Sequence, residues 1–372
     1  MTTDPIDDLI ELPQFTLSRR DRDATLLPLV TETVRWHQEQ LPVLGKLAAS
    51  GGLPNPANAG AAALPYLPVR TFKELDLSSV PRDRIIKVLT SSGTTGQAVS
   101  RINLDAENAN RQQRALAAVM RAVLGEERLP MLIVDSKSVI SSRSSFSARA
   151  AGVIGMMTFG RQHTWLLDPD MNLDKDLLRD FLSRFGGRPF LVFGFTFMAW
   201  RHLLQQLEPG EVVLSGGILI HSGGWKKLEG EAVDNEVFKQ EWLRRTGLAT
   251  VRNFYGMVEQ IGSTFFEGED GWMYAPNFAD VVIRRPSDWS VADHGEPGVI
   301  EVISALPTSY PGNVLLTEDM GVSAPESETG AWLGPRFRIL GRLPKAELRG
   351  CSDTHAANVE AVLTRTGEPV RG

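Results

Sequence analysis

The sequence contains a single cysteine, Cys351, among its 372 residues. One thiol excludes an internal disulfide and any metal site that needs several cysteines. The six histidines are scattered and form no HxH or HxxxH pair, so a structural zinc site is not expected. Long apolar runs are also missing. The longest, residues 189–200, has 12 residues, whereas a membrane-spanning helix needs about 20.

An excess of positive charge is absent as well. The 39 lysines and arginines are outnumbered by 45 aspartates and glutamates, which gives a net charge of −6. The chain therefore lacks the broad positive field of a nucleic-acid-binding protein. The N-terminus is acidic where a signal peptide would be basic, so a cytoplasmic location is predicted. Hydrophobic residues make up 42% of the chain and charged residues 23%, a balance typical of a folded globular protein.

From residue 85 onward, short apolar runs alternate with amphipathic stretches. Asp105 can cap a helix with an apolar stripe that ends at Gly125. This alternation favours a mainly parallel sheet covered by helices, in which ligands sit beyond the carboxyl ends of the strands. The further predicted strands are 85–89, 131–134, 190–195, 212–214, 218–220 and 249–254, and the further predicted helices are 174–185, 196–207 and 234–245.

The two ends of the chain have different patterns of apolar, Gly and Pro residues. Residues 24–48 are predicted to be mostly helical, with interruptions at Pro28 and Pro42, before a flexible connection at 49–62. After residue 270, short β-like runs separated by Gly and Pro predict a smaller antiparallel unit. The predicted division is an N-terminal helical segment 1–65, an α/β core 66–270, a β-rich subdomain 271–340 and a tail 341–372.

The strongest local signal is the stretch Thr-Ser-Ser-Gly-Thr-Thr-Gly-Gln at residues 90–97. Seven of these eight residues are Ser, Thr or Gly. Such a loop offers backbone N–H groups and hydroxyls at close approach, which suits phosphate oxygens. It is not a Walker A loop, because no Lys follows Gly96. A plain hairpin turn is the alternative interpretation.

This loop resembles the phosphate loop of the adenylate-forming enzymes, which include acyl-CoA synthetases and phenylacetate-CoA ligases. Three further segments resemble motifs of that family in the same order. Residues 253–259 are similar to its Tyr-Gly-x-x-Glu motif and residues 316–319 to its Thr-Gly-Asp motif; 341–342 with 347–350 resemble the hinge before its small C-terminal domain. The resemblance implies an α/β fold of parallel sheets flanked by helices, with a smaller antiparallel β unit.

Other segments resemble one branch of the family, the acyl-protein synthetases of bacterial bioluminescence. These segments are residues 144–149, 221–226 and 349–353. Similar stand-alone adenylases occur in phenazine antibiotic pathways, where the acid is aromatic. The resemblance covers residues 70–355.

The resemblance implies that ATP and a carboxylic acid react to give an acyl-adenylate and pyrophosphate. It assigns Glu259 to Mg²⁺, Tyr255 to the adenine or the reacting carboxylate, and Asp319 to the ribose hydroxyls. Arg342 would reach ribose or phosphate. Ordinary alternatives are a solvated Glu, a core Tyr, a turn Asp and a surface Arg. The implied phosphate-binding residues are Ser91, Ser92, Gly93, Thr94, Thr95 and Gly96.

Two other parts of the site follow from the same resemblance. The turn Ser222, Gly223, Gly224 is preferred over residues 215–217 as the flat surface against adenine. Phe195 and Trp225 are candidate walls of the acid pocket, although an aromatic residue in this pattern is also compatible with the core. Arg149 and Lys226 are candidates to hold a substrate carboxylate, or else surface charges.

Cys351 matches the cysteine that carries the acyl group in the bioluminescence enzyme; a buried, inert Cys is the alternative. Only 30 residues follow Arg342, so the small C-terminal domain and its lysine are expected to be missing or vestigial. The predicted function is activation of a carboxylic acid, preferably aromatic and phenazine-type, for a downstream reductase or acyl-acceptor protein. The alternatives are a fatty acyl-protein synthetase acting through Cys351 and a non-catalytic acid-binding protein. A homodimer is one assembly that the sequence allows.

Overall fold

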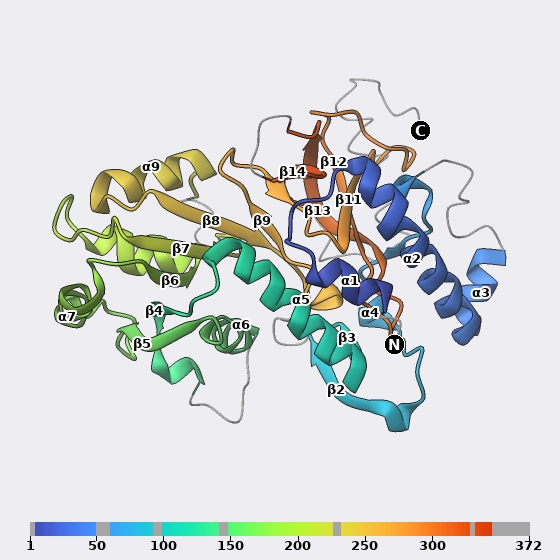
Figure 1. Cartoon of the computed structure of the whole chain (residues 1–372), viewed down its shortest axis with the longest axis horizontal. Coiled ribbons are helices and arrows are strands. Elements are labelled where there is room, and N and C mark those ends of the chain that lie inside the picture. The colour runs from blue at the N-terminus through green and yellow to red at the C-terminus, as the bar shows by residue number, and fades with distance from the viewer. Residues whose placement is uncertain are drawn as a thin grey trace, which may run out of the picture.

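A computed structural model describes residues 4–49, 60–91, 99–140, 148–225, 232–327 and 332–343. The strands within these residues form one 12-stranded sheet and a separate hairpin of β2 and β3. The order in the large sheet is β11-β12-β13-β14-β10-β9-β8-β7-β6-β4-β5, and β1 pairs with β13. Figure 1 shows β4 to β8 on the left, β11 to β14 on the right and the β2–β3 hairpin at the lower edge.

The helices are α1 Pro5–Glu11, α2 Arg19–Gln40, α3 Pro42–Ala49, α4 Thr71–Glu74, α5 Ala106–Leu124, α6 Ala148–Met157, α7 Lys175–Phe185, α8 Thr196–Met198 and α9 Asn235–Thr246. The strands before the antiparallel half are β1 Leu67–Pro68, β2 Ile85–Thr90, β3 Arg101–Asp105, β4 Leu129–Ser136, β5 Gly160–Leu167, β6 Phe190–Phe195, β7 Gly217–Ser222 and β8 Thr250–Tyr255. The others are β9 Phe265–Glu267, β10 Met273–Tyr274, β11 Ala279–Arg284, β12 Gly298–Ser304, β13 Val314–Ala324 and β14 Arg336–Arg342.

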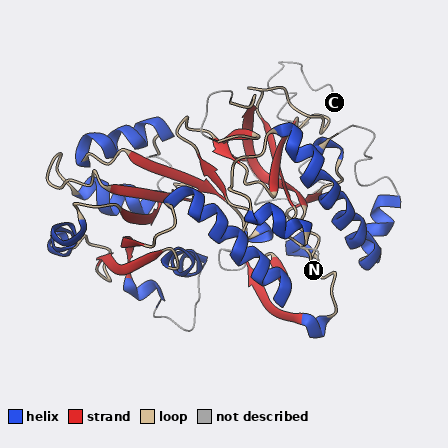
Figure 2. Ribbon diagram, in the orientation of Figure 1, coloured by secondary structure: helices blue, strands red, loops and turns tan. Residues whose placement is uncertain are grey.

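Strands β5, β4, β6, β7 and β8 are parallel and have helices on both faces (Figure 2). Side chains alternate along β4, so that Met131 and Ile133 enter one core and Leu132 and Val134 the other. The first core includes residues of α5 and α6, and the second includes residues of α7 and α9. A strand buried on both faces can present polar groups to a ligand only at its end.

The direction of pairing changes at β9, which runs antiparallel to β8. From there to β11 every neighbouring pair is antiparallel. Helix α2 is fastened to this half by Arg22, whose buried guanidinium donates to the carbonyl oxygens of Ala275, at 2.9 Å, and Pro276. The short strand β1 runs parallel to the start of β13.

Most of the predicted elements are confirmed. Asp105 caps α5 by accepting a hydrogen bond from the N–H of Asn108, and Gly125 ends the helix with a φ of +83°. Strand β6 has the predicted bounds, and α7 and α9 begin one residue later than predicted, because Asp174 and Asp234 are their N-caps. The parallel sheet and the antiparallel strands after residue 270 are both present.

Three predictions need correction. Pro28 lies inside α2 and does not interrupt it. Residues 212–214 are not a strand: Val212 and Leu214 are buried anchors of the loop before β7. The helix predicted at 196–207 is irregular, with a π-helical turn at Ala199–Leu203. The antiparallel strands after residue 270 continue the same sheet, because β9 and β10 hydrogen-bond them to the parallel half.

The predicted boundary at residue 270 falls in the turn between β9 and β10, within this sheet. The division into four units therefore stays a prediction. None of the described helices combines the length and the apolar character that a membrane crossing requires.

Candidate active site

The ends of four parallel strands lie at one edge of the sheet. In the strand register Phe195 of β6 is opposite Ser222 of β7, and Ser222 is opposite Phe254, one residue before Tyr255 of β8. Asp135 stands near the end of β4. The structure thus brings Phe195, Ser222 and Tyr255 to the edge where parallel sheets bind ligands.

Tyr255 connects this edge to the antiparallel half. Its hydroxyl donates a hydrogen bond of 2.7 Å to Oδ2 of Asp319 on β13. Burial, and next the charge of Asp319, raise the pKa of Tyr255 well above its ordinary value. The phenol is therefore neutral and acts as a donor at any physiological pH. It holds the Asp319 carboxylate, the group expected to accept the ribose hydroxyls.

Glu259 lies in a short 3₁₀ turn, Val258–Gln260, that follows β8. Its side chain is 5% exposed, and its backbone oxygen accepts a 2.9 Å hydrogen bond from the Tyr310 hydroxyl. Burial is the main cause that raises the pKa of the Glu259 carboxyl, against the lowering effects of the Ser100 hydroxyl and the Lys73 charge. The Ser100 hydroxyl faces this carboxylate without a hydrogen bond of ordinary geometry. A bound cation would stabilise the ionised form of such a buried group.

The base of the predicted phosphate loop lies beside Glu259. Residues 92–98, which include Ser92, Gly93, Thr94, Thr95 and Gly96, are outside the described residues. Their flanks are joined: the N–H of Ser91 donates to the oxygen of Ser100 at 3.2 Å, and the N–H of Ser100 donates to Oγ of Ser91 at 2.9 Å. Since Ser100 faces the Glu259 carboxylate, the loop starts and ends next to the predicted magnesium ligand.

Three further charges complete this part of the site. Arg342 stands opposite Asp319 in the β13–β14 register, and its Nε lies 3.8 Å from Oδ1 of Asp319. Its Nη2 lies 3.7 Å from Oε2 of Glu318, and the Lys73 ammonium lies 3.8 Å from the same oxygen. The predicted residues Tyr255, Asp319 and Arg342 are therefore joined by direct contacts, and Glu259 is close enough for its charge to help raise the pKa of Tyr255.

Oxygen donors at this place fit a magnesium ion. The buried Glu259 carboxylate and the Ser100 hydroxyl are hard ligands of the kind that Mg²⁺ takes. Among the described residues, no group of three or more His, Cys, Asp or Glu side chains converges on one point. A magnesium ion here would need further oxygens, which nucleotide phosphates and water usually supply.

At the same edge, Phe195 stands between two glycines. A Cβ atom on Gly152 of α6 would lie 3.1 Å from the ring, and one on Gly223, where φ is +85°, would lie 3.5 Å from it. The ring is partly exposed, as is Trp225, which packs edge-on against Trp200 and Phe238. Phe195 thus remains a candidate wall of the acid pocket.

Of the two residues predicted to hold a substrate carboxylate, Arg149 and Lys226, the structure describes only Arg149. The Arg149 guanidinium is paired with Asp135, and its Nε donates to Oδ2 of Asp135 at 2.7 Å. A substrate carboxylate would have to share this guanidinium with Asp135. Lys226 and Cys351 lie outside the described residues.

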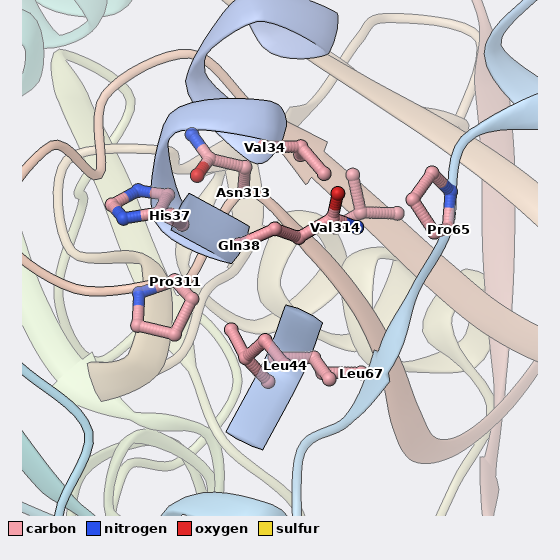
Figure 3. A pocket seen from close by; sticks show the side chains of 9 residues that line it. All are labelled: Val34, His37, Gln38, Leu44, Pro65, Leu67, Pro311, Asn313 and Val314. Atoms are coloured by element: carbon pink, nitrogen blue, oxygen red, sulfur yellow. The ribbon is translucent and has the colours of Figure 1, made fainter. Parts of the chain in front are cut away.

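A small cavity lies elsewhere, between α2, α3, β1 and the start of β13 (Figure 3). His37 and Asn313 line it together with apolar side chains such as Leu44, Leu67 and Val314. Its volume is about 20 Å³, which is enough for a water molecule and too small for a nucleotide or an acid. It contains none of the predicted site residues.

Sequence reasoning missed the roles of three residues at the charged end of the site. Ser100 and Lys73 lie in segments without a recognisable motif, and only the fold brings them to Glu259. Glu318 offered a signal, because it occupies the place of the glycine in the Thr-Gly-Asp motif. Asp135, which pairs with Arg149, was also not anticipated.

Comparison with known proteins supports the fold and the family. The family model described as acyl-protein synthetase, LuxE, matches residues 47–359. A long-chain-fatty-acid–luciferin-component ligase of Aliivibrio fischeri is 22% identical over 298 residues, 78% of this chain and 77% of the relative. The Vibrio harveyi protein of that name is 26% identical over 137 residues, 36% of this chain and 35% of the relative.

Among solved structures, an open conformation of 2-hydroxyisobutyryl-CoA ligase in complex with 2-HIB-AMP and CoA has a TM-score of 0.63. It is 16% identical, with 88% of this chain and 76% of that chain covered, and so supports the fold. The family match spans most of the chain and agrees with the order of the motifs. The chain belongs to the acyl-protein synthetase (LuxE) family and is an adenylate-forming ligase that activates a carboxylic acid.

Proposed function

We propose that the chain uses ATP and Mg²⁺ to convert a carboxylic acid into its acyl-adenylate at the junction of the two halves of the sheet. The observation that carries the proposal is the 2.7 Å hydrogen bond between Tyr255 and Asp319, which joins the two halves, with the buried Glu259 in the turn after Tyr255 and the Ser100 hydroxyl close enough to lower the pKa of its carboxyl. Hydroxyl groups, a buried carboxylate and a ribose acceptor are thereby combined in one place.

In this reaction a carboxylate oxygen of the acid attacks the α-phosphorus of ATP, and the bond from that phosphorus to the bridging oxygen of pyrophosphate breaks. Magnesium, when bound, neutralises charge on the phosphate oxygens. The contribution of the chain is positioning and electrostatic stabilisation. Glu259 and Ser100 provide oxygen ligands, Asp319 accepts the ribose hydroxyls, and Tyr255 keeps Asp319 in place.

The class of acid has two candidates. The relatives named as long-chain-fatty-acid ligases favour a fatty acid. An aromatic, phenazine-type acid would need flat apolar walls, but four of the large aromatic residues between 190 and 275 are buried core residues: Phe193, Trp200, Phe265 and Phe266. This weakens the argument for an aromatic acid, which now depends on partly exposed residues such as Phe195 and Trp225.

Pyrophosphate exchange tests the proposal. Labelled pyrophosphate should enter ATP when the purified chain is given ATP, Mg²⁺ and the right acid. A panel of fatty acids of increasing length and of aromatic acids identifies the class. The alternative of a non-catalytic acid-binding protein predicts that an acid binds, as measured by calorimetry, without exchange. If none of the acids in the panel supports pyrophosphate exchange, the proposed function is contradicted.

The fate of the acyl group is a separate question. The product would pass to a downstream reductase or acyl-acceptor protein, either as the adenylate or through a thioester on Cys351. Intact-mass measurement after incubation with ATP and the acid should show an acyl adduct that Cys351→Ser lacks. If the wild-type chain shows exchange and no adduct, the adenylate is released without a covalent step at Cys351.

A further inference from the structure

Helix α4 is held beside the active site by the strand before it. Strand β1 pairs in parallel with the start of β13, and the N–H of Val69 donates to the oxygen of Leu316 at 2.9 Å. The chain then turns directly into α4 at Thr71. Because β13 continues from Leu316 to Glu318 and Asp319, this pairing places α4 next to the carboxylates of the site.

Two further contacts fix α4 on its other sides. Phe72 is fully buried and packs edge-on against the ring of Tyr310, at 6.0 Å between centroids, and Tyr310 holds the backbone of Glu259. The helix also packs against β3, the strand that leaves the predicted phosphate loop. Just after α4, Oδ1 of Asp76 accepts a 2.7 Å hydrogen bond from Asn103 of β3.

These contacts bring Lys73 to the charged part of the site. Its ammonium lies 3.8 Å from Oε2 of Glu318, and its charge is close enough to Glu259 to lower the pKa of that carboxyl. A contact of 3.8 Å is an ion pair and is too long for a hydrogen bond. Glu318 therefore holds the ammonium in place without using its N–H donors. The Lys73 side chain is 30% exposed, so a further anion can reach it.

We propose that Lys73 is an additional substrate-binding residue, whose ammonium binds the polyphosphate chain of ATP while Glu318 holds it beside Glu259. This inference rests on the proposed function. The position of α4 indicates that its ligand is the polyphosphate. This helix packs against β3, the strand that follows the predicted phosphate loop, and against Tyr310, which holds the backbone of Glu259. A cation here offsets the negative charge that Glu259, Glu318 and Asp319 present to an incoming nucleotide.

The test is equilibrium binding of ATP and of AMP, measured by calorimetry with Mg²⁺ and without any acid. Lys73→Met should weaken ATP binding about 10- to 100-fold, the range for a lost hydrogen bond between charged groups, and leave AMP binding nearly unchanged. Lys73→Arg keeps the charge and should restore part of the ATP affinity. In the exchange assay, the KM for ATP should rise more than kcat falls.

Lys175→Met is a matched control. It removes a lysine from another Lys–Glu ion pair, with Glu211 at 2.9 Å, on α7 and outside the proposed site. It should change neither ATP nor AMP binding. The inference is overturned if Lys73→Met binds ATP like the wild type, or if it loses ATP and AMP affinity equally, as a merely structural role predicts. A wild-type chain that binds no ATP would instead overturn the proposed function.

Discussion

The two halves of the sheet contribute to the site in different ways. In the parallel half both faces of β4, β6 and β7 are covered by helices, so side chains reach the site only where strands end. In the antiparallel half, β13 is buried from Val314 to Thr317 and becomes partly exposed from Glu318 to Met320. Two consecutive carboxylates of this strand, Glu318 and Asp319, are therefore accessible, and both lie near the Arg342 guanidinium.

This difference suggests that the two halves of the sheet bind different parts of the substrates. The parallel half, with Phe195 between two glycines, is suited to the uncharged part of the acid. The junction and β13, with Glu259, Glu318 and Asp319, are suited to the nucleotide and its cation. The variants below alter one half at a time, beginning with the largest expected effect.

Glu259→Gln alters the junction most strongly. It removes the buried carboxylate and keeps the shape of the side chain, so pyrophosphate exchange should fall by about 100-fold or more, the scale for one preorganised electrostatic group. The thermal unfolding midpoint should not fall, because an ionised buried carboxylate costs free energy that a neutral amide avoids. Exchange at the wild-type rate would contradict the metal role of Glu259.

Tyr255→Phe should have a smaller effect on the same half. It removes the 2.7 Å hydrogen bond to Asp319 and leaves the ring packed edge-on against Phe337. We expect the KM for ATP to rise about tenfold, which corresponds to about 1.4 kcal/mol, the scale of one hydrogen bond to a charged group. The preference among acids should stay the same. A changed acid preference would place Tyr255 in the acid pocket instead.

Gly152→Ala tests the parallel half. The new Cβ would lie 3.1 Å from the Phe195 ring and displace it, so relative exchange rates within the acid panel should change a few-fold, with the KM for ATP unaffected. Gly155→Ala is the control on the same helix, since its Cβ would meet no atom within 4 Å. If both variants have the same acid preference as the wild type, Phe195 does not line the acid pocket.

His37→Gln should leave exchange at neutral pH unchanged and alter only the pH dependence of stability. Burial lowers the pKa of His37 to about 4 from an ordinary 6.5. The unfolded chain therefore binds a proton that the folded chain does not, and the wild type loses stability as pH falls from 6.5 to 4. The loss is at most about 1.4 kcal/mol for each pH unit.

The measurement is urea unfolding between pH 7.5 and 4. The slope of unfolding free energy against pH in this window should be shallower in His37→Gln. His221, with a pKa lowered to about 3 by burial, adds a contribution of the same sign that the variant retains. Glu301, with a pKa raised to about 7 by burial, contributes with the opposite sign in both proteins. Equal slopes would show that His37 has the same pKa in the folded chain as in the unfolded chain.

Local signals predicted the fold well where one segment decides its own structure. Asp105, Asp174 and Asp234 cap helices because a side-chain oxygen satisfies a nearby N–H, and no distant residue is needed. Residues 212–214 show the reverse case. Their apolar character predicts a strand, but Leu214 lies in a loop and pairs with no strand. Its N–H donates to the backbone oxygen of Thr246, the last residue of α9. Pro28 remains within α2, which packs on the antiparallel half.

The sequence by itself determined the order of the motifs, the parallel sheet and the identity of the groups at Tyr255, Glu259, Asp319 and Arg342, because these depend on residue type and spacing. Only the tertiary structure decided that Ser100 and Lys73 lie beside Glu259 and that Arg149 pairs with Asp135. The contacts of Ser100 and Lys73 join residues far apart in the chain, and they depend on the pairing of β1 with β13 and on the end of the β2–β3 hairpin near Glu259. The Arg149–Asp135 pair joins α6 to the end of β4.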